Sequence, residues 1–193
     1  MIPNTFVDFY GDQTRWFLGE VVNVKDDPLK LGRVKVRVFG VYDDIADEDL
    51  PWAQIVVPIT QGIHKGKGQN LGILVGSQVF GMFLDGQNSQ LPMVIGTVPK
   101  EGDANSKALD NYPYNKVYET ESGHYKEYDD TAGAERIKES HKSGTFYEMD
   151  KDGNMTIDAT KTKARTITII SSGQINVTAP VINVNGDVVK LNS

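Results

Sequence analysis

The sequence predicts an all-β chain, with a small N-terminal barrel followed by strands that several copies of the chain wind around a shared axis. Three observations support this prediction. Short strand patterns recur between residues 16 and 99, glycines recur every 9 to 11 residues from 123 to 153, and the last part of the chain repeats every seven residues. Turn residues at such intervals are typical of a series of short strands. Signals for helices are nearly absent.

The composition limits the classes of function. The 193 residues are 39% hydrophobic, which is slightly low for a self-sufficient globule, and carry a net charge of -6. An acidic balance disfavours binding to a phosphate backbone, which needs Lys and Arg gathered on one face. The chain has no cysteine, which excludes disulfides and thiolate metal sites. Residues 1–15 form an N-terminal segment without the basic start and apolar run of a signal peptide.

Residues 16–99 form the predicted barrel. The alternation is strictest in 33–39, where three valines face one side and Lys35 and Arg37 face the other, as in a half-buried strand. Strands are expected at 16–24, 33–39, 52–57, 78–84 and 93–98. Five strands with a long loop before the fourth fit a small Greek-key barrel of the OB type.

Beyond the barrel the composition changes twice. Residues 100–118 have the polarity of a linker, and we expect the first proteolytic cut near 100–109. From 119 onward, short polar strands rich in Tyr, Thr and charge lie between the recurring glycines Gly123, Gly133, Gly144 and Gly153. These strands carry too few aliphatic residues to close a core within one chain, so we expect several copies to form it together.

The C-terminal end carries the seven-residue repeat. Ile175-Asn-Val-Thr-Ala-Pro-Val is followed by Ile182-Asn-Val-Asn-Gly-Asp-Val and by a shortened third copy. Pro180, Gly186 and the β-branched bias argue against a coiled coil and favour a β-solenoid, in which each repeat is a strand plus a corner. Residues i and i+2 of a strand point to the same side, so the apolar pairs can meet on a common axis. The predicted core residues are Ile167, Ile169, Ile175, Val177, Ile182, Val184, Val189 and Leu191.

The sequence offers no convincing chemical site. The glycine-rich run 62–69 lacks the spacing of a phosphate loop and the Ser or Thr that must follow its Lys. Residues 150–154 resemble the start of a calcium loop, but the Gly is misplaced and no Glu stands at the twelfth position. His64, His124 and His141 are far apart in sequence. We therefore expect no catalytic residue, no cofactor and no metal.

Two ordered sets of motifs resemble a known family. The segment 119–154 contains Ser-Gly-His, Asp-Asp-Thr-x-Gly-x-Glu-Arg-Ile, His-Lys-Ser-Gly-Thr and Glu-Met-Asp-x-Asp-Gly. It resembles the opening of the spike in central spike proteins of contractile phage tails and in valine-glycine repeat proteins of type VI secretion. The runs Asp-Pro-Leu-Lys-Leu-Gly-Arg-Val-Lys-Val-Arg-Val-Phe-Gly and Leu-Pro-Trp-Ala resemble the barrel of the same phage family. The resemblance implies an OB-type barrel followed by an intertwined triple-stranded β-helix over 119–193, and hence a homotrimer.

The resemblance also implies a place and partners. The trimer would sit beneath a separate trimeric hub protein in the baseplate of a phage tail or a tail-like injection particle, and contraction would drive it into the target cell envelope. The type VI relatives begin with hub domains that this chain lacks. A separate spike-tip protein is a further candidate partner, and no nucleic acid is expected. The protein would be made in the host cytoplasm without a signal peptide.

Two other classes of function stay open. A muramidase-type cell-wall hydrolase needs two carboxylates across a cleft, but acid neighbours such as Asp129 and Asp130 point to opposite faces of a strand. Some phage spike proteins insert a muramidase after the barrel, whereas here only about 20 residues separate Val98 from Glu119. An OB-fold module for oligonucleotides or oligosaccharides uses exposed aromatics on a basic face. Here we expect most barrel aromatics to point inward.

Overall fold

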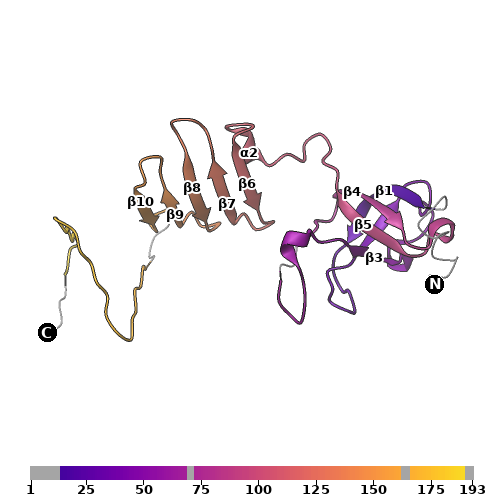
Figure 1. Cartoon of the computed structure of the whole chain (residues 1–193), viewed down its shortest axis with the longest axis horizontal. Coiled ribbons are helices and arrows are strands. Elements are labelled where there is room, and N and C mark those ends of the chain that lie inside the picture. The colour runs from indigo at the N-terminus through magenta and orange to yellow at the C-terminus, as the bar shows by residue number, and fades with distance from the viewer. Residues whose placement is uncertain (1–13, 69–71, 162–165, 190–193) are drawn as a thin grey trace, which may run out of the picture. The chain divides into compact units, whose positions relative to one another are not determined.

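The computed structural model describes residues 14–68, 72–161 and 166–189, and the chain divides into two compact units, Met1–Ala104 and Asn105–Ser193. Figure 1 shows a barrel in the first unit and a row of strands in the second. The strands of the first unit are β1 (Arg15–Asn23), β2 (Val34–Val38), β3 (Trp52–Ile55), β4 (Gln78–Phe83) and β5 (Pro92–Thr97). Its loops contain the short 3-10 turns η1 (Asp47–Asp49), η2 (Ile59–Gln61) and η3 (Gly86–Asn88).

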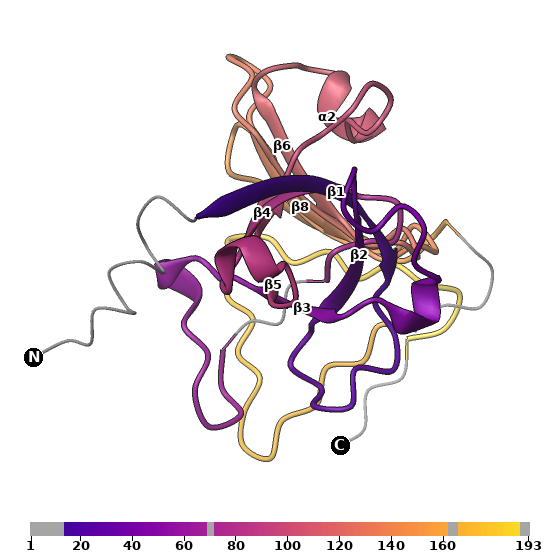
Figure 2. The same cartoon turned by 90° about the vertical axis from the view of Figure 1, so that its right-hand side faces the viewer.

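The first unit is a closed barrel with the strand order β1-β2-β3-β5-β4. The long strand β1 pairs with β2 and also with β4, and this double pairing closes the barrel (Figure 2). The register of β1 against β2 shifts between Val21 and Asn23, and such an irregularity bends a strand. All pairings are antiparallel except β3 with β5. This arrangement confirms the predicted five-stranded OB-type barrel.

Strand alternation builds the barrel core. Phe17 and Phe83 pack with ring centroids 5.0 Å apart, and Tyr42 meets the Phe83 ring edge-on at 5.8 Å. Lys35 belongs to the outward set of β2 yet is buried, because its ammonium bonds the carbonyl of Glu48 and lies 5.2 Å over the Trp52 ring. The buried apolar core comprises Phe17, Val21, Val34, Val36, Val38, Tyr42, Leu50, Ala53, Val79, Phe83 and Val94.

The loop between β1 and β2 is organised by one carboxylate. Asp27 accepts hydrogen bonds from the backbone N–H groups of Leu29, Leu31 and Arg33. The Arg33 side chain also donates to it through Nε at 3.0 Å and through a terminal nitrogen at 2.6 Å. The guanidinium, followed by these backbone donors, holds the pKa of Asp27 far below its usual range despite burial. The Asp-Pro-Leu-Lys-Leu-Gly-Arg motif is therefore a self-closed loop.

The second unit is an antiparallel meander formed within one chain. After the short helix α2 (Ser106–Leu109), its strands are β6 (Asn115–Glu119), β7 (Tyr125–Asp129), β8 (Arg136–Ser140), β9 (Phe146–Met149) and β10 (Met155–Asp158), and each pairs with the next. These strands therefore pair within the chain, and the expectation that several copies close their core together stays a prediction. Tight turns with a glycine at positive φ, as at Gly123 and Gly144, let each strand find its partner locally.

The segment expected as a linker, 100–118, is ordered over its second half. Asn105 caps α2 by accepting from the backbone N–H groups of Lys107 and Ala108. The Lys107 ammonium then bonds Glu119 at 2.5 Å, which ties the helix to β6. The polar composition suggested a linker, but these side chains bond to the sheet rather than to water.

Candidate assembly surfaces

The pairing register divides the second sheet into two faces. Side chains directly opposite each other on neighbouring strands share a face. Tyr118 lies opposite Lys126, Lys126 opposite Glu139, Glu139 opposite Tyr147, and Tyr147 opposite Ile157. These five residues form one row across the whole sheet. We call the face that carries this row the open face; its other members are Lys116, Tyr128, Ile137, Met149 and Met155.

The open face is mostly aromatic and apolar, and it is hollowed. Tyr118 is 59% exposed, Met155 66% and Ile157 58% in the single chain. A cavity of about 630 Å³ lies over the row and is open to solvent. Its lining residues are Tyr118, Thr120, His124, Tyr125, Lys126, Glu139, Ser140, His141, Thr145, Phe146, Tyr147, Met155 and Ile157. Exposed apolar surfaces of this kind mark protein–protein or membrane contacts or ligand-binding grooves.

Three groups at the centre of the row bond one another. The Lys126 ammonium lies 3.3 Å from Glu139 Oε2, and the Tyr147 hydroxyl donates to the same oxygen. The hydrogen bond from the Tyr147 hydroxyl is the larger cause that lowers the pKa of Glu139, and the Lys126 ammonium lowers it further. The same hydrogen bond raises the pKa of Tyr147. The hollow therefore contains a net-neutral cluster of Lys126, Glu139 and Tyr147, and aromatic, apolar and uncharged polar side chains line the rest of it.

The opposite face, which we call the latched face, holds two buried carboxylates. Glu127 and Asp129 are 4% and 2% exposed. Arg136 donates to the two oxygens of Glu127 at 3.0 and 2.9 Å and lies 3.9 Å from Asp129. The Asn115 amide donates to Glu127 and the Asn111 amide to Asp129, both at 2.8 Å. These amides hold the segment that enters the sheet.

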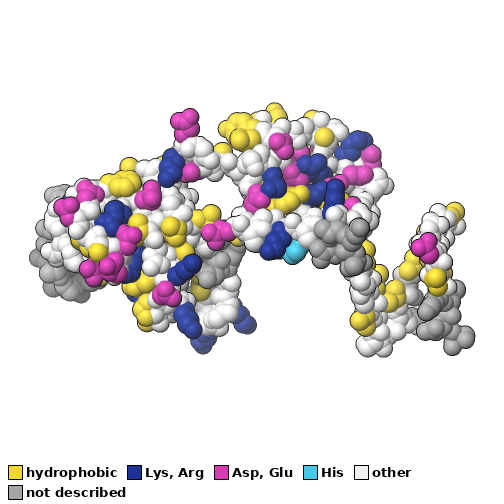
Figure 3. Space-filling model, turned by 180° about the vertical axis from the view of Figure 1, so that it is seen from behind, with side chains coloured by type: hydrophobic (Ala, Val, Ile, Leu, Met, Phe, Trp, Pro, Cys, Tyr) yellow, Lys and Arg dark blue, Asp and Glu magenta, His cyan; other side chains and the backbone are white. Residues whose placement is uncertain are grey.

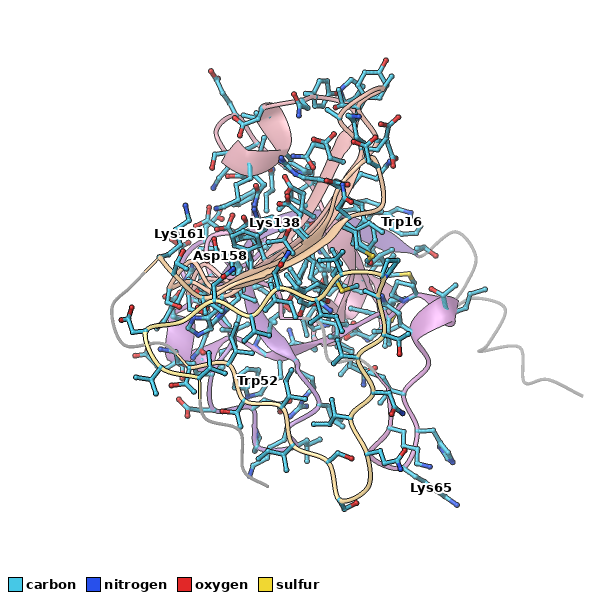
Figure 4. All side chains as sticks on the ribbon, turned by 90° about the vertical axis from the view of Figure 1, so that its left-hand side faces the viewer. Trp16, Trp52, Lys65, Lys138, Asp158 and Lys161 are labelled. Carbon is cyan, nitrogen blue, oxygen red and sulfur yellow. The ribbon has the colours of Figure 1, made fainter. Side chains whose placement is uncertain are left out.

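The pKa of Glu127 shows that these partners outweigh burial. Burial alone would raise its pKa, but the hydrogen bonds from Arg136 and Asn115 and the guanidinium charge lower it below the usual range. The same guanidinium pairing raises the pKa of Arg136. Further along this face, Lys138 bonds Glu148 at 2.8 Å and lies 3.9 Å over the Phe146 ring. The hydrogen bonds from Thr160 are the main cause that lowers the pKa of Asp158, and the positive charges of Lys161 and Lys138 lower it further. These three charged residues are labelled in Figure 4.

The predicted core residues of the tail that the structure describes are solvent-exposed within one chain. Exposure runs from 51% at Val189 to 72% at Ile169. The described residues 166–189 contain no strand, and apolar atoms lie at the surface along this segment in Figure 3. The exposed fractions of the other described members lie within this range, at Ile167, Ile175, Val177, Ile182 and Val184. Leu191 lies outside the described residues. Their inward orientation in an oligomer stays a prediction.

Two histidines distant in sequence meet in the structure. The rings of His124 and His141 are 4.4 Å apart. Backbone N–H groups donate to the Nδ1 atom of each ring, from Lys142 to His124 at 3.3 Å and from Ser143 to His141 at 3.1 Å. The pair therefore helps to close two hairpin turns. Within the described ranges, no group of three or more His, Asp or Glu side chains is placed to hold a metal ion.

The two loops that resemble ligand-binding motifs are turns. In the run 62–69, of which residue 69 lies outside the described part, His64 and Lys67 exchange backbone hydrogen bonds at 3.0 Å. At 150–154, Asp150 accepts from the backbone N–H groups of Asp152 and Asn154, each at 2.9 Å. Each loop is thus closed by its own hydrogen bonds.

The barrel exposes aromatic side chains, contrary to expectation. Phe17, Tyr42 and Phe83 are buried, but Trp16 is 54% exposed and stacks on the exposed Phe80 with ring centroids 5.2 Å apart. Phe39 is also 50% exposed and Trp52 is half-buried, so three of the seven barrel aromatics are buried and the expectation that most of them point inward is wrong. Alternation along β1 and β4 places Trp16 and Phe80 on the outer side. Trp16 and Trp52 lie apart on the barrel (Figure 4).

The exposed stack does not resemble a nucleic-acid site. Leu18 and Met82, which alternate onto the same side as Trp16 and Phe80, are apolar. Single-stranded nucleic acids are bound where stacking aromatics combine with a positively charged groove.

In the part of the chain that the structure describes, no helix has the length and apolar character needed to cross a membrane.

The fold defines a class, an all-β protein with an OB-type barrel followed by a meander sheet and an extended tail. The chain belongs to the Gp5 N-terminal OB domain family, whose model matches residues 34–164. The match runs from β2 of the barrel through the whole second sheet. It supports the resemblance that the motifs suggested, to the central spike proteins of contractile phage tails.

Two relatives agree with this assignment. Protein Gp5 of Vibrio phage KVP40 is 26% identical over 239 residues, covering 74% of this chain and 57% of that protein. The pre-baseplate central spike protein Gp5 of Enterobacteria phage T4 is 38% identical over 89 residues, covering 41% of this chain and 15% of that protein. The chain therefore matches little more than half of the first relative's length and a small part of the second's.

Proposed function

We propose that this chain is the structural central spike of a contractile tail or tail-like injection baseplate. Three copies form the spike, the barrel attaches to a separate hub protein, and the distal end is driven through the target cell envelope. Family membership and the name of the T4 relative, a pre-baseplate central spike protein, support this proposal. We further propose a separate tip protein as a partner, and a location in the virion tail baseplate or in an equivalent tail-like particle; the name of the T4 relative supports the location.

The observation that carries the proposal is the exposed tail. Residues 166–189 place isoleucines and valines in pairs two residues apart, and every pair is exposed in the single chain. Paired positions of this kind share a side of an extended strand. Three such strands wound around one axis would remove these side chains from water and hide the strand edges. We infer that winding between chains begins after β10, since the strands before it pair within the chain.

The proposed function is mechanical rather than catalytic. An interwound trimer resists unfolding because no chain can separate without its partners, so its unfolding should be slow. The alignment with the KVP40 protein is 239 positions long, but it includes only 74% of the 193 residues of this chain. The alignment is therefore longer than the part of this chain that it contains. That relative therefore carries positions inside the matched region that have no counterpart here. We propose that this chain has the spike architecture without an inserted hydrolase.

The mass of the protein in native buffer tests the proposal. Sedimentation or light scattering at micromolar concentration should give three times the chain mass of 21.3 kDa. A monomeric mass would sink the spike assignment. A peptidoglycan clearing assay tests the hydrolase alternative, and we expect no clearing.

A further inference from the structure

The polar row of the open face is incomplete in a single chain. Lys126 and Glu139 keep 55% and 40% of their side-chain surfaces exposed, in a hollow lined by aromatic and apolar side chains together with Thr, Ser and His residues. An ion pair left in water contributes little to stability. The register nevertheless aligns these two with Tyr147 at the centre of the hollow.

We propose that a second copy of this chain closes the hollow and buries the Lys126–Glu139–Tyr147 cluster as a polar layer of the spike interface. This inference rests on the proposed trimer and adds to it a contact that the aliphatic tail does not supply. Each copy would complete the hollow of its neighbour. The cluster would then lie between chains, without direct access to water.

Charge balance favours a second copy as the occupant. One ammonium and one carboxylate make the central cluster neutral, so a copy that presents the same row brings no net charge into the interface. A polar layer in an apolar interface is tolerated when its members satisfy one another, and the Tyr147 hydroxyl supplies the additional hydrogen bond to Glu139. The tail of the same unit also exposes apolar side chains, which the proposed partner chains would cover.

Burial changes what a substitution does, and this difference makes the proposal testable. If the row stays in water, removing either charge has almost no effect. If a neighbour buries the row, Lys126→Met leaves an unpaired carboxylate in every copy, and breaking a buried pair is strongly destabilising. Replacing both partners with apolar residues is often neutral or stabilising. The double variant Lys126→Met/Glu139→Leu should therefore recover most of what the single variants lose, all but the hydrogen bond that Tyr147 donates to Glu139.

The experiment compares the full-length wild type with Lys126→Met, Glu139→Leu, the double variant and Lys151→Met. Lys151 is the matched control, because it pairs with its neighbour Asp152 at an exposed turn, where their side chains are 49% and 64% exposed. Sedimentation over a dilution series gives the trimer dissociation, and circular dichroism on heating gives the stability. Each single variant should weaken association by about 100-fold or more, whereas the double variant should recover most of this loss and Lys151→Met should match the wild type.

The outcomes separate this inference from the proposed function. Wild-type association and heat resistance in both single variants would show that the row stays in water, and would overturn the inference while leaving the trimer standing. A double variant as weak as the single ones would also overturn it, because the loss would then not come from an unpaired charge. A monomeric wild type would remove the proposed function and this inference with it.

Discussion

Arg136→Met is the substitution with the largest effect that the structure predicts in the second sheet. It removes two hydrogen bonds of 3.0 and 2.9 Å to Glu127 and a charge 3.9 Å from Asp129. Both carboxylates are almost fully buried and would keep the neutral amides of Asn115 and Asn111 and the backbone N–H of Thr131. Breaking a buried pair in this way costs about 3–5 kcal/mol per chain. The loss should appear in urea or heat unfolding of the purified protein.

The pH dependence separates this cause from a general packing defect. In the wild type, the pKa of Glu127 is lower in the folded than in the unfolded chain. Its contribution to the stability of the fold is therefore present above the ordinary carboxyl pKa and is lost as the pH falls through the pKa of the folded state. Without Arg136, burial raises that pKa, so protonation relieves the buried charge. The stability gap to the wild type should therefore narrow from pH 7 towards about pH 4. A gap that is independent of pH, or no larger than that of Lys151→Met, would refute the reasoning.

Three further predictions concern the tail, the barrel and the junction between the units. Val184→Asp should make the tail end of the trimer fray, because each buried unpaired charge costs several kcal/mol; wild-type resistance to heat and detergent would show that this side chain does not point inward. Gly81→Ala should destabilise the barrel by about 1–3 kcal/mol, because the new Cβ would lie 2.3 Å from the carbonyl oxygen of Met93, whereas Gly96→Ala has open space and should not lower the heat transition. Limited proteolysis should cut first in the exposed segment 101–104 and release a resistant C-terminal trimer; digestion of the C-terminal half first would contradict the spike assignment.

The barrel strands could be predicted from sequence because alternation is a local signal. The valines of β2 lie within five residues of one another, and the structure places them all in the core. Alternation alone does not predict which side chains contact one another on the outer side of the barrel. Trp16 and Phe80 alternate with buried neighbours as the pattern requires, but their stacking depends on the pairing of β1 with β4.

The second unit was harder to predict because its contacts depend on register. Lys126 and Glu139 are thirteen positions apart in sequence, and only the turn between β7 and β8 brings them opposite each other. Asn111 and Asn115 suggested a linker because they are polar, but their partners are carboxylates on the next strand. The number of chains and the orientation of the tail residues are properties of an assembly, so no pattern within one chain could determine them.

The in-chain meander also sets an order of events during folding. Each strand from β6 to β10 pairs with its immediate neighbour through a short turn, so sequence separation between contacting residues is low and the sheet can form within a single polypeptide. Hairpins of this type close within microseconds, long before copies of a protein meet in solution. The second sheet of each chain can therefore be folded before the chain meets another copy, and it can serve as the template for assembly. The slow, concentration-dependent step of refolding should be the encounter itself, with the tails winding afterwards from the template outward.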